Sequence, residues 1–140
     1  MKVVIGCDHG GLLLKNGIVG LLTNLGHQIE DVGTFTNDSV DYPEFAKTVC
    51  SKVQDGSCER GILICGTGIG MSMVANRFEN IRAALCHELF TARMSREHND
   101  ANVLCLGARV IGPGLAEEIV RVWMTTDFAG GRHLKRIEMF

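Results

Sequence analysis

Residues 61–70 read Gly-Ile-Leu-Ile-Cys-Gly-Thr-Gly-Ile-Gly, an aliphatic run that gives way to glycine at every second position. The aliphatic part predicts a strand buried on both faces, as in a parallel sheet. The glycines predict a tight turn into a helix, where free backbone N–H groups can bind an anion. This stretch therefore predicts an α/β protein with a ligand site at the carboxyl end of a strand.

The same alternation of short apolar runs and helical spacing extends along the whole chain. Runs typical of strands lie at 3–6, 29–32, 61–65, 82–86 and 103–107. Helical spacing is found at 12–25, 42–53, 70–78, 88–97 and 114–124, and the basic tail at about 130–140 predicts a last short helix. The pattern predicts a parallel sheet with helices on both faces, and no linker divides the 140 residues, so we expect one domain over 1–140.

Composition and charge exclude several classes of protein. Hydrophobic residues make up 46% of the chain and charged residues 21%, which is typical of a folded domain. The net charge of -2 gives no overall basic field for nucleic acid or an anionic membrane, and no apolar run is long enough for a membrane span. The six cysteines form no C-x-x-C pair and the chain opens without a leader, so we expect reduced thiols and a cytoplasmic protein.

Polar side chains are expected to gather where the parallel strands end. Asp8 and His9 follow the first predicted strand, and Arg109 follows the last one. The segment 95–102, Ser-Arg-Glu-His-Asn-Asp-Ala-Asn, is a third polar group next to a strand. A plainer interpretation stays open for the first pair, in which Asp8 caps the next helix and His9 is a surface residue.

The loop 66–70 and the preceding Cys65 carry the sharpest chemical signal. A strand-end cysteine that faces a helix N-terminus is favoured as a thiolate, and the loop N–H groups suit a phosphate or an oxyanion. The dinucleotide fingerprint would need glycine where Met71 stands, and no Gly-Lys-Ser/Thr phosphate loop occurs. The alternatives are a turn that only allows close packing and a cysteine that only fills the core.

Further candidates lie in the second half of the chain. Arg132 and Arg136 are four residues apart, so on a helix they share a face and can clamp a phosphate, although a solvated face would look the same. His98 could equally be a residue that stabilises a helix C-terminus, and Asn99 part of a plain loop. No two histidines have the spacing of metal ligands, so we expect no metal site.

Together, these segments resemble one family, the ribose-5-phosphate isomerases of type B with the related galactose- and allose-6-phosphate isomerases. The matching stretches are Gly-Cys-Asp-His-Gly-Gly (6–11), Asp-Tyr-Pro (41–43), the run 61–70, Ser-Arg-Glu-His-Asn-Asp-Ala-Asn-Val-Leu (95–104), Gly-Ala-Arg-Val-Ile-Gly (107–112) and Gly-Gly-Arg-His (130–133). They occur in order and span almost the whole chain. The resemblance implies a three-layer α/β/α, Rossmann-like fold with a five-stranded parallel sheet.

The resemblance also implies an activity, the interconversion of ribose 5-phosphate and ribulose 5-phosphate without a metal or other cofactor. Cys65 would transfer the proton between C1 and C2, Thr67 and the backbone of the loop would stabilise the enediolate, and His98 would help to open the ring. The residues implied in substrate binding are Asp8, His9, Tyr42, Gly66, Gly68, Gly70, Asn99, Arg109, Arg132 and Arg136. Met71 stands where one branch of the family has a glutamate base, so this chain resembles the cysteine-using type.

The resemblance further implies a homodimer, or a tetramer, with active sites at the subunit interface and some arginines reaching in from the partner. The only ligand expected is a phosphorylated sugar, and the pathway is that of the pentose phosphates. Allose 6-phosphate or galactose 6-phosphate remains an alternative substrate. A non-catalytic module that binds a sugar phosphate or nucleotide is a further alternative, and a nicotinamide-dependent oxidoreductase is disfavoured by the incomplete fingerprint.

Overall fold

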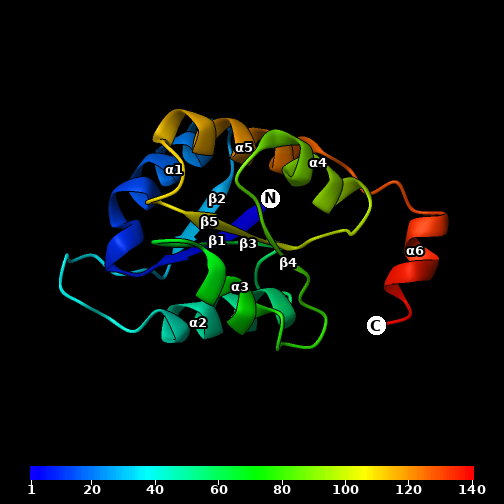
Figure 1. Cartoon of the computed structure of the whole chain (residues 1–140), viewed down its shortest axis with the longest axis horizontal. Coiled ribbons are helices and arrows are strands. Elements are labelled where there is room, and N and C mark those ends of the chain that lie inside the picture. Colours follow the sequence, from blue (N-terminus) through cyan, green and yellow to red (C-terminus); the bar gives the residue numbers. More distant parts are fainter.

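The computed structural model describes all 140 residues as a parallel sheet between two layers of helices (Figure 1). The strands are β1 (Lys2–Cys7), β2 (Gln28–Asp31), β3 (Arg60–Cys65), β4 (Ala83–Leu85) and β5 (Val103–Gly107). The helices are the 3-10 turn η1 (His9–Gly11), α1 (Leu12–Asn24), α2 (Tyr42–Gln54), α3 (Ile69–Ala75), α4 (Leu89–Glu97), α5 (Pro113–Thr125) and α6 (Arg132–Ile137). The three-layer fold with five parallel strands that was expected is therefore confirmed.

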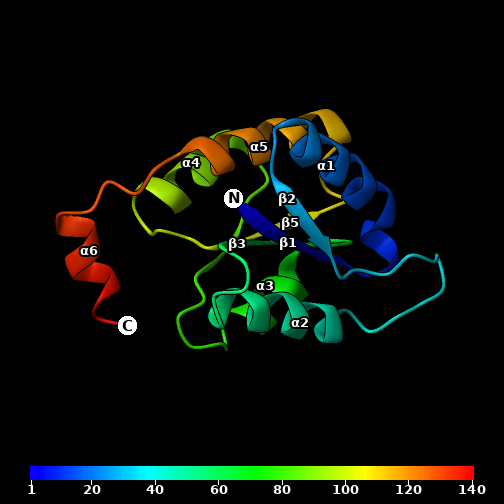
Figure 2. The same cartoon turned by 180° about the vertical axis from the view of Figure 1, so that it is seen from behind.

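The strand order is β2-β1-β3-β5-β4, and every neighbouring pair is parallel. Helices α1, α4 and α5 cover one face of the sheet, whereas α2 and α3 cover the other, as the two opposite views show (Figures 1 and 2). Two apolar cores follow from this arrangement, because alternate side chains of the central strands point to opposite faces. The central strands β1, β3 and β5 are almost wholly buried and thus fix the layers.

The edge strands differ from the expectation that all strands are buried on both faces. The residues of β2 and β4 are partly buried, except Gln28, which is exposed, because each strand has a neighbour on one side only. The edge at β4 is blocked by the side chain of Asn76, which bonds both the N–H and the C=O of Ala83 at 2.9 Å. Asn76 also ends α3, which stops at Ala75 rather than at the predicted residue 78. None of the helices has the length and apolar character that crossing a lipid bilayer requires.

The long loop between β2 and α2 is anchored by a buried lysine. Lys15 of α1 is fully buried, and its Nζ forms an ion pair with Asp31 Oδ2 at 2.8 Å. The same Nζ donates to the carbonyl of Thr34 at 3.0 Å and lies 4.1 Å from the centre of the Phe35 ring. A buried ammonium is stable only when its charge is compensated in this way. The start of the loop that leads to Tyr42 is therefore held in place.

Candidate active site

The chain reverses its winding direction between β1 and β3, which lie side by side in the centre of the sheet. The connection after β1 leads to one edge through α1, and the connection after β3 leads toward the other through α3. Such a switch point leaves a crevice at the carboxyl ends of the two strands, where α/β proteins bind ligands. Asp8 follows β1 and Cys65 ends β3, so both lie at this crevice.

Cys65 is held against the glycine loop through its sulfur atom. The backbone N–H of Gly68 donates to Cys65 Sγ at 3.1 Å, and the residue is 5% exposed. Gly68 has a φ of +75°, and a side chain here would lie 2.5 Å from Leu85 Cδ1, so glycine is required on both grounds. An N–H that donates to sulfur stabilises negative charge there, which suits a thiolate base.

The remaining cysteines lie in environments that keep the thiol protonated. Burial raises the pKa of Cys7 to about 11 and that of Cys50 to about 12. Burial also raises the pKa of Cys58, Cys86 and Cys105. The thiol of Cys7 donates a hydrogen bond to a carbonyl oxygen, whereas the sulfur of Cys65 accepts one. All six cysteines are free, and this difference in hydrogen bonding sets Cys65 apart from Cys7.

The loop after Cys65 offers backbone donors at the same place. The N–H groups of Gly66 and Thr67 donate to no carbonyl or side chain of the protein. The loop is fixed from the neighbouring strand β5, because Arg109 N–H donates to Gly66 O and Ala108 N–H to Cys65 O, both at 2.9 Å. The arrangement can therefore bind an oxyanion next to the sulfur without rearranging.

The predicted binding residues Asp8, His9, Tyr42 and Arg109 surround this loop. Asp8 is 8% exposed and its Oδ1 accepts from Gly10 N–H at 2.9 Å, so it caps η1 as the plainer interpretation predicted and leaves Oδ2 for a ligand. A side chain at Gly10 would lie 3.6 Å from Arg109 Nη2, which brings this guanidinium close to η1. Asp8 and Arg109 thus offer a carboxylate and a cation within one crevice.

His9 and Tyr42 are both positioned by the β2–α2 loop. His9 Nδ1 accepts a hydrogen bond from Val40 N–H at 3.2 Å, which leaves Nε2 to carry the proton of the neutral ring. Tyr42 begins α2, and a side chain at Gly70 would lie 2.6 Å from Tyr42 Cζ. Gly70 is therefore needed, because the phenol ring of Tyr42 lies directly on the loop.

Four predicted site residues lie at the opposite end of the sheet. Gly61, at the start of β3, donates through its N–H to Asn102 O, so the segment with His98 and Asn99 lies near the amino ends of the strands. The expectation that this segment gathers with the carboxyl ends is therefore wrong within one subunit. Gly61 and Cys65 are four residues apart, which separates this segment from Cys65 by roughly 13 Å along the strand.

The helix α6, with Arg132 and Arg136, belongs to this second group. It projects away from the body of the molecule beside α4 (Figures 1 and 2). Its ring of His133 stacks on that of His98, with 4.1 Å between centroids and 8° between planes. Both arginines are exposed and pair with no carboxylate of the chain. The second group is thus a histidine, an amide and two guanidinium groups that pair with no carboxylate.

Three residues near the two groups were not predicted as site residues. His133 stacks on His98, as described, and Asp100 holds the loop that follows His98 through Arg82. His87 Nε2 is buried without a hydrogen-bond partner and lies 2.9 Å from where a side chain at Gly107 would begin, next to the glycine loop. No three His, Cys, Asp or Glu side chains converge as ligands of a metal ion.

Comparison with known proteins places this geometry in a family. The model of the Ribose/Galactose Isomerase family matches residues 3–140. Ribose-5-phosphate isomerase B of Escherichia coli is 47% identical over 137 residues, which cover 98% of this chain and 92% of the relative. D-erythrulose-4-phosphate isomerase of Pectobacterium atrosepticum is 42% identical over 139 residues, covering 99% and 91%.

A solved structure agrees with the arrangement of the whole chain. Ribose-5-phosphate isomerase B of Clostridium thermocellum superposes with a TM-score of 0.98 at 52% identity, covering 99% of this chain and 94% of that one. The family model spans nearly the full length, and the strand-end cysteine, the glycine loop and the arginine helix all lie within the matched residues. The chain belongs to the Ribose/Galactose Isomerase family.

Proposed function

We propose that this protein interconverts ribose 5-phosphate and ribulose 5-phosphate, with Cys65 as the base that transfers the proton. The observation that carries the proposal is the hydrogen bond from Gly68 N–H to Cys65 Sγ, beside the free N–H groups of Gly66 and Thr67. Aldose–ketose isomerisation needs a base for a weakly acidic C–H and donors for the oxygen that becomes negative. The loop supplies both within four residues. The relative in Escherichia coli carries the name of this activity.

The reaction follows from this placement. The Cys65 thiolate takes the proton from C2 of the open-chain aldose, and the electron pair moves onto the carbonyl oxygen at C1 to form an enediolate. The negative oxygen is stabilised by the N–H groups of Gly66 and Thr67. The protonated thiol then returns the proton to C1, while the hydroxyl proton on O2 shifts to O1, which yields the ketose. No atom is gained or lost, so the reaction needs no co-reactant.

A single subunit does not complete this site, and we propose a homodimer in which the partner supplies the second group. His98 would then help to open the furanose ring, and Asn99 would bind hydroxyl groups. Arg132 and Arg136 would hold the phosphate together with His9, since guanidinium groups bind phosphate through paired, charge-assisted hydrogen bonds. The proposal explains why two exposed arginines on α6 have no partner within their own chain.

The exposed apolar side chains at the carboxyl ends of the strands support this interface. Leu13, Ile69, Met73, Phe90 and Val110 are each about half exposed or more. They lie on α1, α3, α4 and the loop after β5, in segments that follow the carboxyl ends of strands, and so at the end of the sheet that holds Cys65. Large apolar side chains clustered on a surface are typical of an interface between subunits.

We propose that the enzyme is cytoplasmic, because six free thiols suit a reducing compartment.

Members of the family are named for sugars of different length. The relative in Pectobacterium atrosepticum is named for a four-carbon sugar phosphate, so the substrate's chain length has to be tested. Initial rates with ribose 5-phosphate, allose 6-phosphate, galactose 6-phosphate and erythrulose 4-phosphate, after treatment with a chelator, test the proposal. We expect turnover that survives the chelator and is fastest with ribose 5-phosphate. Binding of the phosphates without turnover would favour the non-catalytic module instead.

A further inference from the structure

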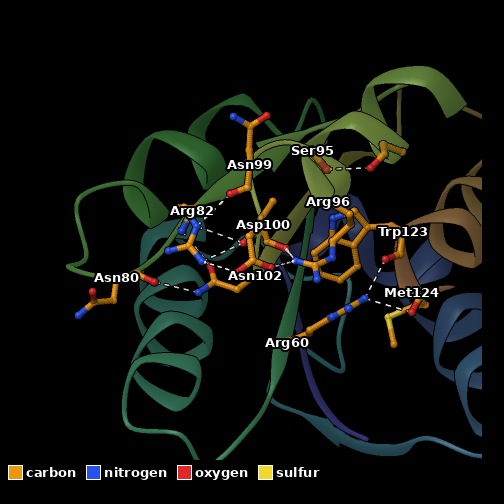
Figure 3. A network of polar contacts seen from close by, with 12 residues as sticks. Arg60, Asn80, Arg82, Ser95, Arg96, Asn99, Asp100, Asn102, Trp123 and Met124 are labelled. Carbon is orange, nitrogen blue, oxygen red and sulfur yellow. Dashed lines mark hydrogen bonds and ion pairs between the residues drawn. The ribbon is translucent and has the colours of Figure 1, made fainter. Parts of the chain in front are cut away.

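The loop 98–102, which joins α4 to β5, is held by two arginine side chains that converge on one carboxylate (Figure 3). Arg96 is 6% exposed, and its Nη1 donates to Asp100 Oδ1 and to Ala101 O, both at 2.7 Å. Arg82 Nη2 donates to Asp100 Oδ2 at 3.1 Å and to Asp100 O at 3.0 Å. Both oxygens of the carboxylate and the carbonyl of the same residue are thus engaged.

Asp100 adopts a backbone conformation that few residues tolerate. Its φ is +45°, in the left-handed region, where asparagine and aspartate are the most readily accepted residues with a side chain. Its N–H donates to Arg96 O at 3.1 Å, and Ala101 N–H donates to Ser95 O at 2.8 Å, so the chain folds back over the end of α4. The conformation persists because the surrounding arginines determine it.

A second layer of contacts fixes Arg96 in turn. The guanidinium groups of Arg60 and Arg96 lie over the ring of Trp123, at 5.2 Å and 5.8 Å from its centroid. Arg60 Nη1 also donates to Trp123 O at 2.8 Å and to Met124 O at 3.1 Å, at the end of α5 (Figure 3). Cations stack favourably on an indole ring. The loop is thereby tied to the core beneath α4 and α5 and not only to its own helix.

The same network reaches the residues that the proposed function needs. His98 and Asn99 directly precede Asp100, and Arg82 Nε donates to Asn99 O at 3.0 Å. We propose that Asp100 is a positioning residue, whose carboxylate between Arg82 and Arg96 sets the direction in which His98 and Asn99 point into the neighbouring subunit's active site. The inference rests on the proposed function but adds a residue that touches neither substrate nor reacting atoms.

Two side chains from separate segments then determine together how His98 is oriented. Asp100 fixes the backbone that follows His98, and His133 of α6 fixes its ring by stacking. The chain after α5 is joined to the same place, because Ala129 N–H donates to Glu97 O at 3.0 Å. Loss of the carboxylate should therefore move the ring of His98 against that of His133, which is a change that can be observed without substrate.

The test compares Asp100→Ala with Asp100→Asn and with the control Asp55→Ala. Asp55 directly follows α2 and its carboxylate accepts from a backbone N–H, that of Ser57 at 2.8 Å, but it lies on an exposed turn. Each variant is assayed for kcat and KM with ribose 5-phosphate well below its melting temperature. The imidazole NMR signals of His98 and His133 are recorded without substrate.

We expect Asp100→Ala to lower kcat by about 10- to 100-fold, since small displacements of a reacting group have effects of this size, and to shift both imidazole signals. Asp100→Asn, which tolerates the left-handed conformation and can still accept from an arginine, should recover most of the activity. Asp55→Ala should match the wild type. A folded Asp100→Ala protein with unchanged kcat, or with unchanged imidazole signals, would overturn the inference.

Failure of the proposed function gives a different result. If the wild type shows no isomerase activity, kcat cannot be compared between the variants. The imidazole NMR signals still show whether the loop 98–102 has changed its conformation. Shifted signals in Asp100→Ala would then uphold the positioning role and refute only the assigned reaction. Unchanged signals would refute the positioning role itself.

Discussion

Two inactive variants should restore each other's activity if each active site takes residues from two subunits. In a mixed oligomer, a Cys65→Ala subunit still provides His98, and a His98→Ala subunit still provides Cys65. A site is complete when both of its contributors are intact, which has a probability of one half each after random mixing of equal amounts. The expected activity is therefore about a quarter of the wild-type value, for a dimer or a larger symmetric assembly.

If each active site were built from one subunit alone, mixing the two variants would restore no activity. His98 and Cys65 lie at opposite ends of the sheet in one subunit, separated by roughly 13 Å along β3, a distance that a side chain does not bridge. The two variants, differently tagged, are co-refolded, mixed oligomers are verified by sequential affinity capture, and initial rates with ribose 5-phosphate are measured. As the control, Cys65→Ala is mixed with the double variant Cys65→Ala/His98→Ala, which should restore no activity because no subunit then provides Cys65. If verified mixed oligomers show no more activity than the separate variants, the shared site is refuted.

Three further results are expected. Arg132→Ala should raise KM for ribose 5-phosphate by at least tenfold, because a guanidinium–phosphate contact is lost, whereas Lys135→Ala on the same helix should leave KM unchanged; equal KM values would contradict the clamp. Lys15→Met should lower the free energy of unfolding in urea by about 3 kcal/mol, since the partly buried carboxylate of Asp31 loses its buried partner, and the exposed Lys47→Met should cost under about 1 kcal/mol; similar losses would contradict the role of burial. Alkylation by iodoacetamide at pH 8 should modify Cys65 first and abolish activity in parallel, because burial raises the pKa of the other thiols; mass spectrometry that finds another cysteine labelled first would refute this.

The central part of the fold could be predicted because its signals are local. The apolar run at 103–107 coincides with β5, and the glycines after Cys65 mark the end of β3 and the start of α3. The helix predicted at 70–78 is shorter, because Asn76 uses its side chain to bond the edge strand β4. Edge strands were misjudged for a similar reason, since the number of neighbours a strand has depends on the topology and not on its own residues.

The site was predictable in its parts but not in its layout. Cys65 with its loop stands at a strand end in the sequence itself, so its position follows from the fold class. The segment with His98 precedes a strand rather than following one, and this order already indicates the amino end of the sheet. The stack of His98 on His133 and the left-handed conformation of Asp100 could not be predicted, because both depend on contacts between segments far apart in the chain.

Whether Cys65 transfers the proton is tested by kcat with ribose 5-phosphate for Cys65→Ala, after chelator treatment, compared with kcat for Cys105→Ala. Cys105 is fully buried in the same apolar core as Cys65. Cys105→Ala therefore removes the same chemical group away from the glycine loop. We expect kcat to fall by about 10²- to 10⁴-fold in Cys65→Ala with KM nearly unchanged, and to stay near the wild-type value in Cys105→Ala. A Cys65→Ala enzyme that keeps kcat within threefold of the wild type would show that Cys65 is not the base.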